Sequence, residues 1–221
     1  MELYDVMRTT FAAREFTEDD LPDDVLWRIL DNARFAPSGG NRQGAHITVV
    51  RDADVRRRLA ELGAGAARRY FAQLSAGENP WNPIHPTSVP QDVIDATEVP
   101  ETFVAPILRA PVVLVVSVDL NVVAAVDQDL DRVGLAGGAS VYPLAWNILL
   151  AARNEGYGGT ITTMAIAEED QVRQLLGIPD QHAVAAAVPL GKPTRQLTKL
   201  RRQPVDQFVT RDRFDGAAFD G

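Results

Sequence analysis

The sequence predicts a single α+β domain, in which helices and strands mix without a regular βαβ repeat. Two apolar runs, Pro111–Val118 and Ala183–Leu190, have the continuous hydrophobic character of strands that are buried on both faces. The segment Ala139–Asn154 is the most apolar helical pattern, which places it in the core or at a subunit interface. The chain of 221 residues is long enough for one domain with a substantial core.

Apolar periodicity and turn residues locate the other elements. Pro143 is tolerated only in a first helical turn, so the regular part of Ala139–Asn154 should begin there. The further elements that we expect are a helix near Leu3–Met7, a helix around Val25–Ala33 that ends before Pro37, a strand at His46–Val50, a helix at Asp54–Arg69, a glycine turn at Gly156–Thr163 and a helix at Glu168–Leu176.

A proline-rich stretch from Ser75 to Pro100 breaks the periodicity and is too long for an ordinary connection. It is either a functional lid or a disordered loop, and its aromatic residues favour a lid. Residues 206–221 form a polar C-terminal tail. We find no domain boundary, so residues 1–221 are expected to form one domain.

Composition excludes several classes of function. The net charge of −8 disfavours a protein that coats nucleic acid or an anionic membrane. The absence of cysteine excludes thiolate nucleophiles, disulfide redox chemistry and iron–sulfur ligation. The three histidines lack metal-ligand spacing, so we expect no metal site. No signal peptide or membrane-length apolar run is visible, which predicts a soluble cytoplasmic protein.

The turn Ala36–Gln43 reads APSGGNRQ and combines glycines, a hydroxyl and two amides. Glycines allow a backbone to approach a flat ligand, and the amides of Asn41 and Gln43 can both donate to and accept from a heterocycle. Serine, glycine and asparagine are also the usual residues of a plain turn, so the residues alone leave both interpretations open.

A second glycine turn, GYGGTITT, could bring backbone beside a ligand at Gly158, Gly159 and Thr160, or it could be a helix C-cap followed by a strand. It lacks the G-x-G-x-x-G pattern and follows a helix, which excludes a Rossmann nicotinamide site.

Basic residues provide the candidate phosphate contacts. Lys192–Arg202 is a basic run inside the acid-free stretch Gln181–Val205, which suits either a phosphate or a solvated tail that pairs with acids elsewhere. Arg14 alone is equally compatible with a phosphate contact and with an ordinary surface position.

Taken together, these segments resemble the nitroreductase family of FMN flavoproteins. The opening VMRTTFAAREF is followed by LPDDVLWRILDNARFAPSGGNRQ and a strand, which is similar to the order of that family. The resemblance continues through PVVLVVSVD, LLAARNEGYGG, LLGIP, VPLGKP and RRQPVDQFV, and covers most of the chain. It implies an α+β fold with a central mixed sheet flanked by helices, in an intertwined homodimer with two FMN sites at the interface.

The resemblance also implies roles for individual residues. Arg14 is expected at the flavin phosphate or ribityl chain, and Gly158, Gly159 and Thr160 beside the isoalloxazine ring. Arg201 and Arg202 occupy the late phosphate-binding place, with Arg202 favoured because it lies two residues before Pro204. The residues expected to line the flavin from one side are Ser38, Gly39, Asn41 and Gln43.

Two departures from the family pattern are visible. Thr10, Phe11 and Ala12 stand where the family has a second arginine and a serine, so either Arg8 takes over or one phosphate contact is lost. After Gln43 the family usually has Pro-Trp, whereas this chain has Gly44-Ala45. The change removes a bulky ring and is expected to open the pocket.

The resemblance implies hydride transfer from NADH or NADPH through FMN to a small electron-poor acceptor, such as a nitroaromatic, a quinone or an enone, in ping-pong order. The chemistry then belongs to the flavin and requires no catalytic side chain. The alternatives are a dehalogenase, a specialised dehydrogenase or oxidase, a non-catalytic flavin-binding protein and a cofactor-free interaction protein.

Four aromatic or imidazole side chains are candidates for the substrate side, because a proline-rich lid would close over the ring face. These are Trp81, His85, Tyr70 and Phe71. For Tyr70 and Phe71 the alternative is that they simply end a helix in the core.

Overall fold

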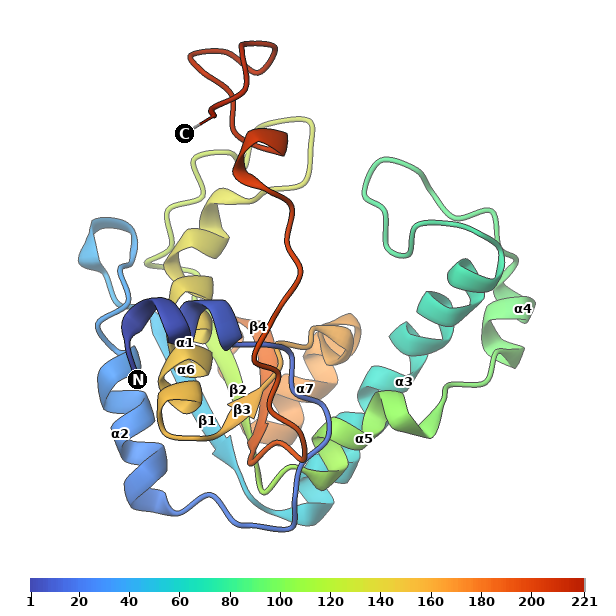
Figure 1. Cartoon of the computed structure of the whole chain (residues 1–221). Coiled ribbons are helices and arrows are strands. Elements are labelled where there is room, and N and C mark those ends of the chain that lie inside the picture. Colours follow the sequence, from blue (N-terminus) through green and yellow to red (C-terminus); the bar gives the residue numbers. More distant parts are fainter. Residues whose placement is uncertain (221) are drawn as a thin grey trace.

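A computed structural model of the protein describes residues 1–220 (Figure 1). Its centre is a four-stranded sheet in the order β1-β2-β4-β3, formed by Ala45–Val50, Val112–Asp119, His182–Gly191 and Gly158–Gly159. All three strand pairings are antiparallel. The expected mixed sheet is therefore wrong for the named strands, and parallel pairing occurs at the isolated bridge between Ala12 and Gly159. The helical connections between strands are long enough for either orientation, so the sequence did not determine it.

Strand β2 is buried on both faces, as its apolar run predicts. Its even-numbered residues, such as Leu114, belong to a core cluster with α2 and α6. Its odd-numbered residues Val113 and Val115 belong to a second cluster with α3, α5 and α7. This alternation follows from the two-residue period of a strand, and it gives the domain one helical layer on each side of the sheet.

The helices confirm most of the expected elements. The α-helices are α1 (Leu3–Thr9), α2 (Asp23–Ala33), α3 (Ala53–Ser75), α4 (Gln91–Ala96), α5 (Glu101–Arg109), α6 (Tyr142–Asn154) and α7 (Glu169–Leu176). The 3₁₀ segments are Gly39–Asn41, Ala136–Ser140, Met164–Glu168 and Val205–Gln207.

Helix α3 is longer than the predicted Asp54–Arg69 and continues to Ser75. The Asp52 carboxylate caps its start by accepting hydrogen bonds of 2.9 Å from the backbone N–H groups of Asp54 and Val55. The helix extends beyond the predicted range because Ala72 and Gln73 are buried, and tertiary packing stabilises its last turns.

Helices α4 and α5 were not expected, because the prolines around them suggested irregular structure. Pro90 and Pro100 lie at the N-caps of α4 and α5, where no helical N–H is needed. Pro106 lies inside α5, which is retained because Ala105, Pro106 and Ile107 are buried.

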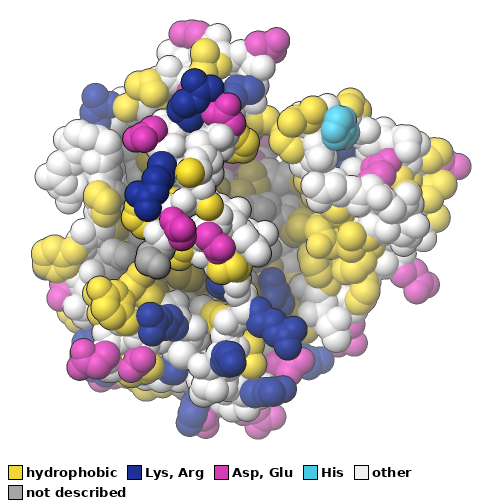
Figure 2. Space-filling model, turned by 45° about the horizontal axis from the view of Figure 1, so that its top comes forward, with side chains coloured by type: hydrophobic (Ala, Val, Ile, Leu, Met, Phe, Trp, Pro, Cys, Tyr) yellow, Lys and Arg dark blue, Asp and Glu magenta, His cyan; other side chains and the backbone are white. Residues whose placement is uncertain are grey.

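The end of α3, the segment 76–90 and α4 form a lobe that projects from the sheet (Figure 1). Figure 2 shows a hollow between this lobe and the body of the molecule. The C-terminal tail leaves β4, passes α1 and extends away from the sheet (Figure 1). Within residues 1–220, none of the helices has the length and apolar character that a membrane span requires.

Candidate functional site

An extended segment, residues 12–16, carries Arg14 between β3 and the start of the C-terminal tail. The backbone N–H of Ala13 donates to the Gly159 carbonyl at 2.9 Å, and that of Thr194 donates to the Glu15 carbonyl at 3.1 Å. The Arg14 guanidinium is exposed and donates a long hydrogen bond of 3.4 Å to the Ala12 carbonyl. Among residues 1–220 it has no acidic partner within ion-pair distance, so its charge is available to an anion.

Arg14, Tyr70 and Thr160 line one cavity of about 190 Å³, although they come from three distant parts of the sequence. The Thr160 side chain is buried and begins a polar wall. Phe103 and Tyr70 form an aromatic wall with stacked rings 5.7 Å apart. The lining residues that sequence reasoning missed are Phe103, Pro106, Ile107, Ile161, Thr162, Thr163 and Met164.

Tyr70 and Phe71 differ in their surroundings. Tyr70 faces the cavity, whereas Phe71 is half-buried beside it and packs edge-to-face on Phe103 with ring centroids 5.0 Å apart. Phe71 therefore fits the alternative of a packed helix residue. Phe103 was missed because it lies on α5, a helix that the sequence pattern did not predict. The available signal was the position of this aromatic residue, one helical turn before Pro106.

Close packing accounts for the glycine pair. A Cβ atom on Gly159 would lie 2.3 Å from the Pro189 carbonyl oxygen, and one on Gly158 would lie 2.9 Å from the Pro193 ring. Both residues are buried in β3. Their lack of a side chain is therefore required by packing, against β4 for Gly159 and against residues that flank the sheet for Gly158. Contact of Gly158 and Gly159 with a ligand stays a prediction.

The polar turn forms a second region, in which the backbone is strained. Gly40, Asn41 and Gln43 have φ angles of 61°, 53° and 51°, in the left-handed region. Asparagine visits this region more often than most residues, whereas glutamine rarely does. The Ser38 hydroxyl accepts a hydrogen bond of 3.0 Å from the Gln43 backbone N–H, which holds the turn closed. Such strain is concentrated at functional sites.

The segment 120–140 supports this turn. The Gly39 backbone N–H donates to the Ser140 hydroxyl at 3.2 Å, and the Arg42 guanidinium donates to the Val122 carbonyl at 3.3 Å. A Cβ atom on Gly44 would lie 2.3 Å from Val122 Cγ2, so any side chain at this position would have to displace Val122. Gly44 thus lets the segment close onto the turn.

Asp127 organises the supporting segment. Its buried carboxylate accepts hydrogen bonds of 2.7 Å from the Leu135 backbone N–H and 2.8 Å from the Arg132 guanidinium. These bonds favour the charged form and lower the pKa of Asp127 to about 2.

The two regions are separate in one chain. Ser38 and Gln43 line a cavity of about 640 Å³ beside α2 and α6, and none of its lining residues is shared with the cavity at Arg14. The polar turn lies beside α2 and β1, away from α3 and α5 (Figure 1). The cavity at Arg14 is also smaller than the usual volume of roughly 300–1,000 Å³ for small-molecule sites. One chain therefore does not bring all the predicted site residues together.

The remaining basic candidates are exposed. Arg8 lies on α1 with its guanidinium 6.0 Å from the Tyr4 ring centre. Arg202 donates to the Arg201 carbonyl at 2.7 Å. Lys192, the first residue of the basic run, pairs with Asp19 at 2.7 Å, which raises the pKa of Lys192 and lowers that of Asp19. Lys192 thus follows the alternative of pairing with an acid, and a phosphate contact of Arg201 or Arg202 stays a prediction.

The segment 76–90 is a loop that is closed by hydrogen bonds to a single carboxylate. Glu78 accepts hydrogen bonds from Thr87, Ser88 and the buried Gln73, and these bonds lower its pKa to about 2. Trp81 has a φ of 55°, and the Arg69 guanidinium lies 4.2 Å from its ring centre. Trp81 and His85 do not line the cavity at Arg14.

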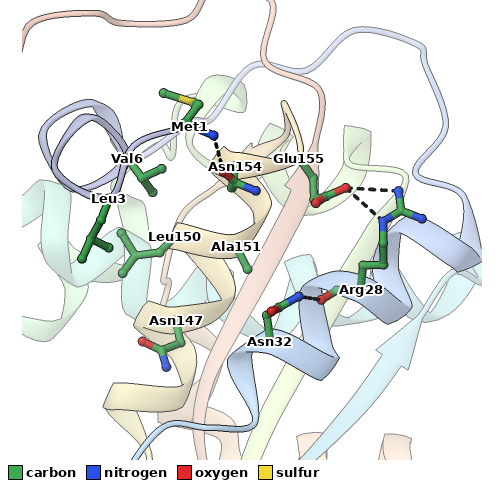
Figure 3. A pocket seen from close by; sticks show the side chains of 10 residues that line it. All are labelled: Met1, Leu3, Val6, Arg28, Asn32, Asn147, Leu150, Ala151, Asn154 and Glu155. Atoms are coloured by element: carbon green, nitrogen blue, oxygen red, sulfur yellow. Dashed lines mark hydrogen bonds and ion pairs between the residues drawn. The ribbon is translucent and has the colours of Figure 1, made fainter.

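A further cavity of about 340 Å³ lies between α1, α2 and α6 (Figure 3). The Arg28 guanidinium pairs with the Glu155 carboxylate at 3.1 Å, and the Met1 amino group donates to Asn154 Oδ1 at 2.9 Å. Figure 3 shows these contacts tying the chain start and α2 to the end of α6. No predicted site residue lines this cavity.

The model of the nitroreductase family matches residues 7–192. The chain belongs to the nitroreductase family. This membership confirms the predicted family and oxidoreductase class, and the structure confirms the predicted α+β fold.

Several relatives resemble this nitroreductase-family chain along most of its length. A protein of Thermus thermophilus named NADH dehydrogenase is 29% identical over 198 residues, which are 90% of each chain. An iodotyrosine deiodinase, solved with FMN and 3-iodo-L-tyrosine, superposes with a TM-score of 0.68 at 20% identity and covers 96% of this chain and 100% of its own. The NADPH:FMN oxidoreductase of Vibrio harveyi, solved with NAD+, gives 0.67 at 21% identity, with 96% and 78% covered.

Proposed function

We propose that this protein is an FMN-dependent oxidoreductase, in which NADH or NADPH supplies a hydride that reaches a small electron-poor acceptor in ping-pong order. The observation that carries the proposal is the convergence of Arg14, Tyr70 and Thr160 on one cavity. Family membership and the FMN named for two matched structures support it.

The residues at the cavity fit the chemical groups of FMN. A phosphate requires cationic N–H donors, and the Arg14 guanidinium is exposed with no acidic partner among residues 1–220. A flavin ring requires flat apolar surfaces and hydrogen bonds at its polar edge. Tyr70 and Phe103 supply the first requirement, and the hydroxyl groups of residues 160, 162 and 163 supply the second.

We further propose that the working form is a homodimer. Two-fold symmetry can bring the polar turn of one copy against the Arg14 cavity of the other, which would unite residues that one chain keeps apart. Exposed apolar side chains on α1 and α6 suit an interface: Leu3 is 65% exposed, Tyr4 70% and Trp146 43%.

Each group in this arrangement has a defined part. FMN, when bound, supplies the hydride transfer itself. Arg14 and Arg202 hold the phosphate, and the Thr160 hydroxyl and the amides of Asn41 and Gln43 orient the ring by hydrogen bonds. The lobe that carries Trp81 borders the hollow in Figure 2, and in this arrangement it would cover the ring face and exclude water from it.

Reductive dehalogenation is a second candidate. The solved chain of the matched iodotyrosine deiodinase is covered over its whole length, which supports a shared fold. A nitroaromatic, quinone or enone and an iodinated phenol are all small and electron-accepting, and the acceptor assay below distinguishes them.

The first test is the visible absorption spectrum of the purified protein, before and after NADH or NADPH is added without oxygen. We expect flavin bands that bleach with one of the two donors. Bands that persist would contradict the proposed donor, and absence of bands after incubation with FMN would contradict the cofactor. The reduced protein is then mixed with nitrobenzoate, menadione or 3-iodo-L-tyrosine, and return of the flavin bands identifies the acceptor class.

Matched variants test the site. Arg14→Ala should weaken FMN binding by about tenfold or more, because a charge-assisted hydrogen bond contributes about 1.5–3 kcal/mol. Arg57→Ala on the exposed face of α3 should leave it unchanged. A monomer on a sizing column would contradict the proposed two-copy site.

A further inference from the structure

The cavity of about 640 Å³ beside the polar turn has the size of a ligand site. It lies between α2, the start of β1 and the start of α6. The flavin assignments use only Ser38 and Gln43 of its lining. The other lining residues are Trp27, Leu30, Asp31, Arg34, Ala36, Pro37, Ala45, His46, Ile47, Ser140 and Leu144.

One side of the cavity is apolar. Trp27 is 71% exposed, which is unusual for a large aromatic ring, and it shares the lining with Leu30 and Leu144. An exposed indole above aliphatic side chains offers a flat surface on which an aromatic ring can stack.

The small side chain of Ala45 leaves room in the cavity. Ala45 is the first residue of β1 and lines the cavity with a single methyl group. The carbonyl of Gly44 before it accepts a hydrogen bond of 2.9 Å from the Asp119 backbone N–H, so the backbone at this point is held in place. A bulky ring at position 45 would project into the cavity, because the Ala45 side chain lines it.

The polar end of the cavity has unused hydrogen-bond donors. The Ser38 hydroxyl accepts from the Gln43 backbone N–H, and the Ser140 hydroxyl accepts from Gly39. Each hydroxyl hydrogen remains free to donate to a ligand, since neither has an acceptor among residues 1–220. Arg34 uses Nε to pair with Asp31 at 2.7 Å, which leaves its terminal N–H groups without an acceptor in the same range.

We propose that this cavity binds a planar aromatic molecule that carries acceptor oxygens, with its ring on Trp27 and its oxygens at Ser38 and Ser140. A donor-rich end selects an acceptor group, because a ligand without one would leave these hydroxyl groups unpaired. Ser38 is also among the residues that are expected to line the flavin, so the test compares flavin-loaded with flavin-free protein to separate the two uses of this residue.

The test is equilibrium dialysis of the protein as purified, and of the same protein stripped of any flavin, with 2-naphthoate as a redox-inert probe. We expect one saturable site per chain in both samples. Ala45→Trp should weaken binding at least tenfold by filling the cavity. Val49→Trp adds the same ring at an exposed position of β1 that does not line the cavity, and should bind as the wild type does.

Further variants keep the test decisive if Ala45→Trp alters folding. Trp27→Ala changes an exposed side chain and should weaken binding several-fold with an unchanged melting temperature. Ser140→Ala should weaken 2-naphthoate and leave 2-methylnaphthalene, which has no oxygen, unaffected.

Three results of these binding measurements would overturn the inference, and a fourth comes from loading with FMN. These are the absence of saturable binding to either sample, wild-type affinity in both Ala45→Trp and Trp27→Ala, and equal affinity for 2-naphthoate and 2-methylnaphthalene. Loss of probe binding on loading with FMN would also overturn it, since the cavity would then belong to the flavin site. Colourless protein that binds the probe would contradict the proposed function alone.

Discussion

The Glu78 carboxylate accepts a hydrogen bond of 2.6 Å from the hydroxyl of Thr87, nine residues further along the chain. The same carboxylate accepts from the backbone N–H and the hydroxyl of Ser88, each at 2.7 Å, and from the Gln73 amide at 3.0 Å. Gln73 also accepts from the Trp81 backbone N–H at 3.2 Å. One charged group thus closes the loop and fixes the start of the segment that carries Trp81.

The closed loop should open in acid. In the folded protein the pKa of Glu78 is lowered from 4.5 to about 2 by these hydrogen bonds. A lowered pKa means that the stabilisation is complete above pH 4.5 and is lost as the pH falls towards 2. Hydrogen exchange of amides 79–90 should therefore accelerate across this window.

Glu78→Gln should accelerate the same exchange already at pH 7 and remove its dependence on acid. Glu98→Gln, which removes an equal charge from an exposed position, should behave as the wild type does. Identical exchange in the wild type and Glu78→Gln would show that the carboxylate does not hold the loop.

Asp127→Asn should loosen the polar turn from a distance. The variant loses the charge that organises residues 127–136 and hence the support of the segment that contacts Gly39. We expect faster proteolysis within residues 120–140 and faster exchange at the Gln43 amide. Asp129→Asn is the matched control, because Asp129 is exposed on the same segment. Equal proteolysis of the two variants would contradict this role of Asp127.

Gly159→Ala should destabilise the protein by about 1–3 kcal/mol, the usual cost of overpacking a tight contact. The reason is the distance of 2.3 Å between a Cβ atom at this position and the Pro189 carbonyl oxygen. Gly65→Ala on α3 meets no atom within 4 Å and should instead stabilise the helix by about 0.5–1 kcal/mol. Urea denaturation measures both, and a loss in Gly65→Ala equal to that in Gly159→Ala would refute the packing argument.

Arg202→Gln should weaken FMN binding by about tenfold, which corresponds to about 1.4 kcal/mol. Arg202 makes no ion pair within residues 1–220, so its charge is free to bind a phosphate. The variant removes this charge and one internal hydrogen bond, which Arg202 donates to the Arg201 carbonyl. Titration of flavin fluorescence measures the effect. Arg201→Gln is the neighbouring control, and a larger loss there would assign the phosphate to Arg201 instead.

Trp81→Ala should change the KM for the acceptor several-fold while FMN stays bound. Trp81 has a left-handed backbone conformation and its ring lies against the Arg69 guanidinium, which fits a side chain that is positioned for use. Ile84→Ala removes a side chain of the same loop that is 78% exposed, and should leave the KM unchanged. Steady-state kinetics that are equal for the two variants would remove Trp81 from the substrate side.

Local sequence patterns predicted much of the fold. The apolar run at β2 was sufficient because a strand buried on both faces needs no partner to be recognised. Helix α5 was missed because Pro106 breaks the pattern and only burial against its neighbours retains the helix. The sequence also did not predict the orientation of the strands, because this orientation depends on the packing of the long connections between them.

The sequence by itself determined the family, the α+β class and the residue types available for a phosphate and a flat ring, because these depend on local composition and order. The tertiary structure alone decided that Arg14, Tyr70 and Thr160 share a cavity while Ser38 and Gln43 lie in another. It also decided that close packing requires glycine at Gly158 and Gly159. The physical reason is that distances between segments far apart in the chain are set by packing, which no local pattern records.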